Sequence, residues 1–149
     1  MNIQFVRASE KKSLLKQLDE QFGISKLPFL LIESGKEKVR AFSGSLSKDE
    51  ILNLRSFLNI ESIGLYIIAK ESPIRLSFDA PHLLKYQISK NIIPIDLTKL
   101  NEWLHGFDLE IKKPSGSYII SFNNDFVGLG KSNSEKILNH IPKDRRLKN

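Results

Sequence analysis

The residues best suited to chemistry in this chain of 149 residues are the basic side chains near its end. Residues 131–149 carry six Lys or Arg and two Asp or Glu, whereas residues 91–130 carry three and five. Ammonium and guanidinium groups bind phosphate oxygens through charge-assisted hydrogen bonds. The net charge of +6 favours an acidic partner, of which nucleic acid is the commonest. A short charged terminus can equally be a solvated tail.

One motif in this region looks like a nucleotide site but has the wrong spacing. Gly130-Lys131-Ser132 matches the end of a phosphate-binding loop, yet the glycine required five positions earlier is replaced by Asp125. That loop also joins a strand to a helix, whereas we predict that this segment is one strand of a hairpin. We therefore expect no nucleotide-binding loop.

Other residue types that could carry out chemistry are absent or scattered along the sequence. The chain has no cysteine, which excludes disulfides, thiolate metal sites and cysteine nucleophiles. Its histidines, His82, His105 and His140, lie in different predicted elements without a carboxylate cluster at ligand spacing, so we expect no metal site. Since no catalytic order of Ser, His and Asp stands out, we expect no enzymatic activity and no cofactor.

The apolar runs of the sequence are too short for a membrane span. The longest, from Ile63 to Ala69, is far below the roughly 20 residues that cross a bilayer. The polar start MNIQFVRASEKK does not have the pattern of a secretory signal. We expect a cytoplasmic protein that does not bind membranes.

The last third of the chain has an order of motifs that resembles a known RNA-binding domain. An aromatic strand and a turn precede Phe126-x-Gly128-x-Gly130-Lys131, and then follow Ile137-Leu138-Asn139, Pro142-Lys143 and Arg145-Arg146. This order is similar to the C-terminal PUA-type domain of the Sun/RsmF-type RNA cytosine-5 methyltransferases. It also resembles small archaeal proteins that carry the domain without the enzyme. The similarity extends back through Glu102-Trp103-Leu104-His105-Gly106 and, more loosely, through residues 75–79.

The resemblance implies a fold and a function. A pre-PUA domain followed by a PUA domain also occurs in a ribosome-assembly factor family of archaea and eukaryotes. We therefore expect an α+β protein with a small α/β pre-PUA domain, residues 1–90, and a PUA-type β pseudo-barrel, residues 91–149. The expected function is binding of structured rRNA or tRNA in ribosome biogenesis or RNA modification. The methyltransferases attack the base with a cysteine, which this chain lacks, so the expected role is non-catalytic.

The expected RNA contacts are basic residues around a groove and one glycine. In PUA domains generally, the glycine after the short helix lets the backbone approach RNA, and the resemblance carries that role onto Gly106 alone. An ordinary helix C-cap accounts for the same glycine. The full set of expected contacts is Lys99, Gly106, Lys112, Lys113, Lys131, Lys143, Arg145 and Arg146.

Two other functions stay open at the level of sequence. In the first, the N-terminal domain holds a separate RNA methyltransferase or ribosome-assembly factor, and the PUA domain is a scaffold. In the second, the chain is an enzyme with an unrecognised pocket, against which the absence of a nucleophile, metal cluster and cofactor loop argues.

Local patterns predict the elements of the N-terminal domain. Ser9 is a plausible N-cap for a helix that runs to about Phe22 and ends at Gly23. Ser47-x-x-Glu50 is a capping box for a second helix, with Ile51, Leu54 and Leu58 on its apolar face. The predicted strands are residues 29–32, 38–43, 65–69 and 74–78, and a short helix capped by Asp79 follows.

The C-terminal domain is predicted to be rich in strands. An edge strand at residues 91–96, a helix at 98–104 and a strand at 108–111 precede a hairpin of residues 118–122 and 126–131. Gly128 and Gly130 share one face of that hairpin, which allows either close packing or the approach of a ligand. Trp103 beside the apolar helix stripe is expected to anchor the core or a domain interface rather than to stack on bases.

Overall fold

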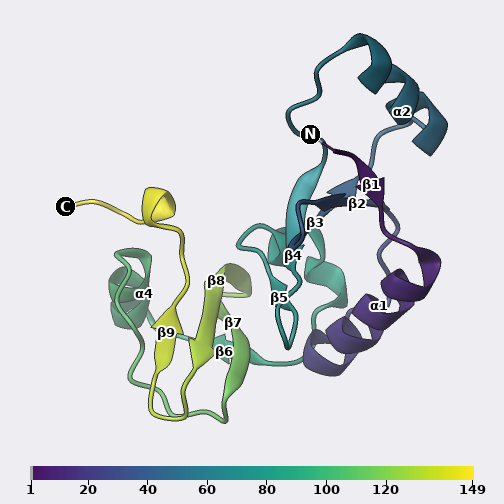
Figure 1. The fold of residues 1–149 in the computed structure, drawn as a ribbon. Helices are drawn as coiled ribbons and strands as arrows, with labels where there is room; N and C mark the ends of the chain where they lie inside the picture. The colour runs from purple at the N-terminus through teal and green to yellow at the C-terminus, as the bar shows by residue number, and fades with distance from the viewer. Residues whose placement is uncertain (1) are drawn as a thin grey trace. The chain divides into compact units, whose positions relative to one another are not determined.

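A computed structural model of the chain describes residues 2–149, which form two compact units (Figure 1). The first unit contains the residues up to Glu20 together with Ile24–Ala80, and the second contains Gln21–Gly23 and Pro81–Asn149. The division falls inside α3 (Ala80–Leu83), and residues 81–90 thus group with the second unit. The domain boundary expected near residue 90 stays a prediction.

The first unit is built on a five-stranded antiparallel sheet with the order β1-β2-β3-β4-β5 (Figure 1). All four strands predicted for this region are present, and β1 is an additional short edge strand. The strands are β1 (Gln4–Phe5), β2 (Leu30–Ser34), β3 (Lys38–Phe42), β4 (Leu65–Ala69) and β5 (Arg75–Leu76).

Helix α1 (Ala8–Phe22) ends at Gly23 as predicted, but Ser9 is not its N-cap. The first helical hydrogen bond runs from the Lys11 N–H to the Arg7 carbonyl at 2.9 Å, so Arg7 occupies the cap and Ser9 lies inside the first turn. The sequence-based N-cap was therefore wrong by two positions. The buried stripe of the helix is Leu14, Leu18 and Phe22.

Helix α2 (Lys48–Phe57) has the predicted capping box but not the predicted buried face. The Ser47 N–H donates to Glu50 Oε2 at 2.6 Å, and the Glu50 N–H donates to Ser47 Oγ at 3.2 Å. Ile51 is fully buried, whereas Leu54 is exposed and Leu58, at the C-cap with extended φ and ψ, is 60% exposed. The helix thus packs on the core through one residue, and the expected apolar face was wrong.

The second unit contains a four-stranded sheet with the order β6-β7-β8-β9. Its strands are β6 (Ile92–Pro94), β7 (Gly116–Phe122), β8 (Asp125–Ser132) and β9 (Ile137–Asn139). As Pro94 predicts, β6 is an edge strand. The β7–β8 hairpin turns at Asn123 and Asn124, whose φ angles of 47° and 66° suit a two-residue turn. A closed pseudo-barrel and a pre-PUA identity for the first unit stay predictions.

The strand expected at residues 108–111 is not formed. Leu109 and Ile137 exchange two backbone hydrogen bonds at 2.9 Å, but this is an isolated bridge. The ladder does not continue toward residue 111, because the Ile111 N–H donates to the Leu109 carbonyl at 2.8 Å instead of to a neighbouring strand. Strand β9, which the sequence did not predict, instead pairs with β8.

Trp103 on α4 (Leu97–Leu104) forms the centre of the core of the second unit. Its side chain is fully buried, and its Nε1–H donates to the Val127 carbonyl at 3.0 Å. A Cβ atom built on Gly128 would lie 2.7 Å from Trp103 Nε1, and one on Gly130 would lie 3.0 Å from its Cη2. The two glycines therefore allow close packing of the indole, and Trp103 is a core residue of its own unit.

Candidate nucleic-acid interface

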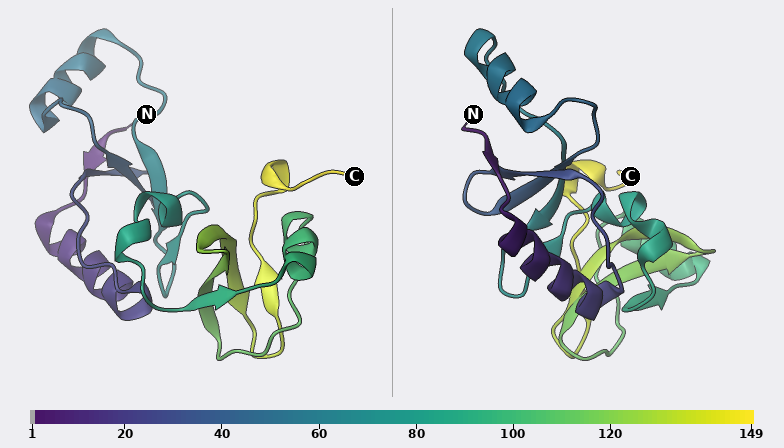
Figure 2. Two further views of the ribbon diagram at one scale, coloured as in Figure 1. Left: turned by 180° about the vertical axis from the view of Figure 1, so that it is seen from behind. Right: turned by 90° about the vertical axis from the view of Figure 1, so that its right-hand side faces the viewer.

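The eight expected RNA contacts all lie in the second unit, but they do not form one cluster. Views from three sides show the loops at residues 112–116 and 132–136 at one end of the sheet, and the C-terminal segment beside α4 toward the other (Figures 1 and 2). The loop group is Lys112, Lys113 and Lys131. The C-terminal group is Gly106, Lys143, Arg145 and Arg146. Lys99 lies apart from both, in the first turn of α4.

The loop group presents ammonium groups that are open to solvent. Ser132 Oγ donates to the Lys113 carbonyl at 2.6 Å and ties the two loops together. Lys112 Nζ lies 3.7 Å from Glu135 Oε2, and both side chains are more than three-quarters exposed, so this ion pair contributes little. Within residues 2–149, neither Lys113 nor Lys131 makes an ion pair, and both are exposed. Both are therefore available for phosphate binding.

The C-terminal segment is held against α4 and is not a solvated tail. The Leu147 N–H donates to the Leu104 carbonyl at 2.8 Å, and Arg146 Nε donates to the Ile141 carbonyl at 2.9 Å. The 3₁₀ turn η2 (Lys143–Arg145) between these anchors exposes both of its basic side chains. The segment thus presents Lys143 and Arg145 from a fixed backbone.

Asp108 is the acidic residue that contacts both β9 and the loop before it. Its Oδ2 lies 2.9 Å from Lys136 Nζ, and its Oδ1 accepts the Asn139 N–H. The hydrogen bond from Lys136 is the main cause that lowers the pKa of Asp108, with smaller contributions from the Asn139 N–H and from the charge of Arg146. The same ion pair raises the pKa of Lys136. Lys136 is therefore engaged within the unit.

The segment that contains all these residues is similar to a known protein family. Residues 90–147 match the model of a family described as the methyltransferase RsmF PUA domain. The second unit contains a PUA-type domain. The match begins at Lys90 and confirms the resemblance of this segment to the PUA-type domain of these methyltransferases, while the first unit lies outside it. No curated protein sequence matches the chain.

Lys99 of the PUA-type domain is partly occupied by its own helix cap. Asp96 is the N-cap of α4 and accepts the Lys99 N–H at 2.8 Å, while Lys99 Nζ lies 3.5 Å from Asp96 Oδ2. The backbone hydrogen bond from Lys99 is the main cause that lowers the pKa of Asp96. Lys99 is therefore a weaker candidate for RNA contact than the lysines of the loop group.

The PUA-type domain also exposes an aromatic side chain that sequence reasoning missed. Phe107 is 65% exposed, although its backbone is fixed at both ends. Its N–H donates to the Glu102 carbonyl at 3.1 Å, and its own carbonyl accepts Asn139 Nδ2 at 3.0 Å. The available signal was an aromatic residue directly after the helix-ending Gly106. An exposed ring on a rigid backbone is suited to stacking on a base.

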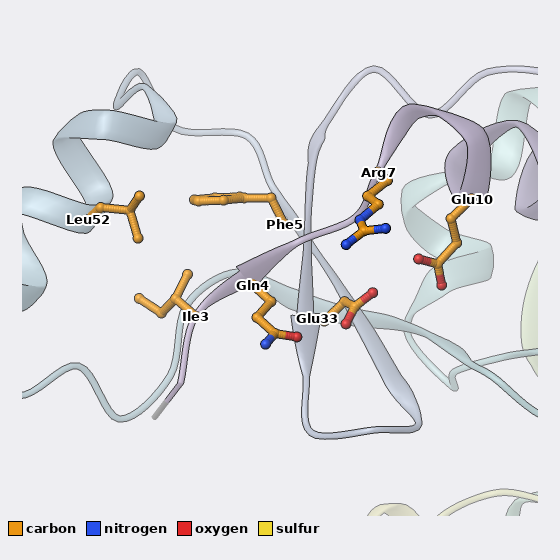
Figure 3. A pocket seen from close by; sticks show the side chains of 7 residues that line it. All are labelled: Ile3, Gln4, Phe5, Arg7, Glu10, Glu33 and Leu52. Carbon is orange, nitrogen blue, oxygen red and sulfur yellow. The ribbon is translucent and has the colours of Figure 1, made fainter.

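A pocket of about 510 Å³ lies in the first unit and is lined by both apolar and charged residues (Figure 3). Apolar Ile3, Phe5 and Leu52 lie toward one side of it, and Arg7, Glu10 and Glu33 toward the other (Figure 3). Both carboxylates bind the same ammonium group, because Lys70 Nζ lies 2.5 Å from Glu10 and 2.9 Å from Glu33.

The two carboxylates of this pocket, Glu10 and Glu33, form ion pairs with Lys70. Lys70 is the main cause that lowers the pKa of Glu10, so this carboxyl is ionised near neutral pH and is not a proton donor. Within residues 2–149, no group of three His, Asp or Glu could hold a metal ion, and no helix is long and apolar enough to cross a membrane.

Proposed function

We propose that the chain is a non-catalytic RNA-binding protein that recognises structured rRNA or tRNA, in ribosome biogenesis or RNA modification. The observation that carries this proposal is the match of residues 90–147 to the family described as the methyltransferase RsmF PUA domain. The family thereby suggests RNA as the partner. The net charge of +6 has the sign that an RNA-binding surface requires.

The placement of the cations favours recognition of folded RNA. The loop group and the C-terminal group lie toward different ends of the sheet, so an RNA that touches both must span the domain (Figure 2). Folded RNA presents phosphates over such a distance in a fixed geometry, and lysines recognise that geometry without reading bases. A short single strand would bind one group only.

The non-catalytic part of the proposal rests on the composition of the chain. Without a cysteine, the chain cannot attack a cytosine base through a thiolate. The pocket of the first unit contains carboxylates paired with Lys70 and no nucleophile next to a general base. We therefore assign the chemistry of any modification to another protein.

A second function is favoured by the exposed apolar residues of α2. Phe57 is 83% exposed and Leu58 60% exposed, and Leu54 adds to the same helix end. Exposed apolar side chains in sequence proximity are typical of protein contacts. In this alternative the first unit holds an RNA-modifying enzyme or an assembly factor. Co-purification of such a protein that survives nuclease treatment and disappears in Phe57→Ser would support it.

Binding of the purified full chain to transcribed rRNA and tRNA fragments tests the main proposal. We expect the triple variant Lys112→Ala, Lys113→Ala and Lys131→Ala to weaken binding and to reduce the slope of log affinity against log salt by roughly 0.7 to 0.9 for each phosphate that the variant no longer neutralises. The matched control removes three exposed lysines of the first unit, Lys12, Lys16 and Lys36. An equal weakening in both variants would show a diffuse charge effect and would contradict a site in the PUA-type domain.

A further inference from the structure

Gly106 is covered by another residue of the same chain. A Cβ atom built on Gly106 would lie 2.7 Å from Arg146 Cδ and 2.9 Å from its Nε and Nη1. The φ angle of Gly106 is +96°, in the region that favours glycine. The space that a glycine leaves open is thus filled by the guanidinium-bearing side chain, 40 residues later in the sequence.

Arg146 is fixed in this position while part of its guanidinium stays available. Its Nε donates to the Ile141 carbonyl at 2.9 Å, and the next residue, Leu147, is anchored on Leu104. Within residues 2–149, the terminal nitrogens Nη1 and Nη2 have no hydrogen-bond partner. Since guanidinium groups bind phosphate through two parallel N–H donors, the side chain of Arg146 is held with the donors that a phosphate requires.

Phe107 follows Gly106 directly in the sequence and has an exposed aromatic ring. Hydrogen bonds of its N–H and carbonyl fix its backbone, and its side chain is 65% exposed. An exposed aromatic ring on the residue after the glycine that Arg146 covers, together with that guanidinium, matches the two chemical parts of one nucleotide. A base inside a duplex has both faces stacked, so only an unpaired base can use such a ring.

We propose that Arg146 and Phe107 form a subsite for an unpaired RNA nucleotide, with the base stacked on Phe107 and its phosphate on Arg146. This inference rests on the proposed RNA-binding function and specifies where a single-stranded end or bulge is read. It also changes the role expected for Gly106, which supports Arg146 and does not itself present its backbone to RNA. Arg146 is accordingly a binding residue, and Gly106 is a positioning residue.

The test compares two probes on the full chain by fluorescence anisotropy. One probe is an RNA hairpin with an unpaired 3′ extension, and the other is the same hairpin with a blunt end. We expect Phe107→Ala to weaken binding of the extended hairpin by about 5- to 150-fold, the range for one base–aromatic stack, and to leave the blunt hairpin unchanged. Tyr86→Ala is the matched control, because Tyr86 is a fully exposed aromatic residue elsewhere in the second unit, in η1 (Lys85–Gln87).

Two further variants test the role of the guanidinium. Arg146→Lys keeps the charge but loses the planar fork, so we expect weaker binding of the extended hairpin alone. Gly106→Ala should have the same effect because its methyl group displaces Arg146. Gly35→Ala is its control, since Gly35 also has a positive φ, +67°, but has no atom within 4 Å of an added Cβ. A melting curve of each variant shows whether it is folded, and Arg146→Lys tests the subsite even if Gly106→Ala unfolds.

The outcomes separate this inference from the proposed function. If the wild-type chain binds both hairpins and the Phe107 and Arg146 variants bind them equally well, the subsite is wrong and RNA binding stands. If the wild-type chain binds neither hairpin and none of the rRNA and tRNA fragments, both proposals are wrong. A weakening for the blunt hairpin as large as that for the extended one would also overturn the subsite, because it would show a general phosphate contact.

Discussion

Arg146 and Lys143 should respond to mutation in different ways, because the side chain of Arg146 is bonded to the backbone of Ile141 whereas that of Lys143 is exposed. Arg146→Ala removes the Nε–H donor from the Ile141 carbonyl and the covering of Gly106. A hydrogen bond to a charged group contributes about 1.5 to 3 kcal/mol to the free energy of unfolding. At roughly 2 to 4 °C per kcal/mol for a chain of this size, the melting temperature should fall by about 3 to 12 °C.

Lys143→Ala should instead leave the melting temperature unchanged and reduce RNA binding. Lys143 is exposed and makes no ion pair within residues 2–149, so its effect on the free energy of unfolding is expected to be near zero. The salt slope of RNA binding should fall by roughly 0.7 to 0.9 if Lys143 contacts one phosphate. Thermal denaturation without RNA and salt-dependent binding, measured on the same preparations, separate the two effects. An Arg146→Ala variant that melts at the wild-type temperature would refute the reasoning.

Four other perturbations have definite expected results. Gly130→Ala should lower the free energy of unfolding by about 1 to 3 kcal/mol in urea, because its Cβ would collide with Ile137 Cγ2 and lie 2.9 Å from the Leu138 carbonyl oxygen. The lowered pKa of Asp108 means that its ionised form stabilises the fold above the ordinary carboxyl pKa, so this stabilisation is lost as pH falls below about 4 and Asp108→Asn should remove it from the acid-unfolding curve. A fragment of residues 81–149 should melt higher than one of residues 91–149, because Leu84 and Ile88 are buried residues of the second unit. Incubation of the chain with RNA and S-adenosylmethionine should yield no 5-methylcytosine, and its detection by mass spectrometry would contradict the non-catalytic proposal.

Elements governed by neighbouring residues could be predicted from the sequence. The capping box of α2 needs only Ser47 and Glu50, and the β7–β8 turn needs only two adjacent asparagines that accept positive φ. Elements governed by distant partners could not be predicted. Strand β9 is three residues long, too short for a periodic pattern, and it forms because residues 130–132 supply a ladder partner. The missing strand at residues 108–111 is a separate case, because the Ile111 N–H donates to the nearby Leu109 carbonyl and is not available to a ladder.

In the candidate site, too, local features could be predicted from the sequence and contacts between distant residues could not. The sequence identifies basic residues near the C-terminus because charge is a local property, and the structure describes Lys113, Lys131, Lys143 and Arg145 on the surface. The sequence does not indicate that Arg146 covers Gly106, because no local pattern connects two residues on separate elements. It also does not indicate the exposure of Phe107, since an aromatic residue after a helix is more often buried than open to solvent.

The glycines of the motif that resembles the PUA family serve the packing of the core. Gly128 and Gly130 lie against Trp103, and the residue in this motif that reaches solvent is Lys131. A match over these positions therefore reports that the Trp103 core can form, since any larger residue there would collide with the indole or with β9. Two chains can satisfy this requirement and still differ at Phe107 and Arg146, which lie outside the packed core. The family match thus supports the fold of the domain more directly than its choice of RNA, and that choice should be sought in the residues around the end of α4.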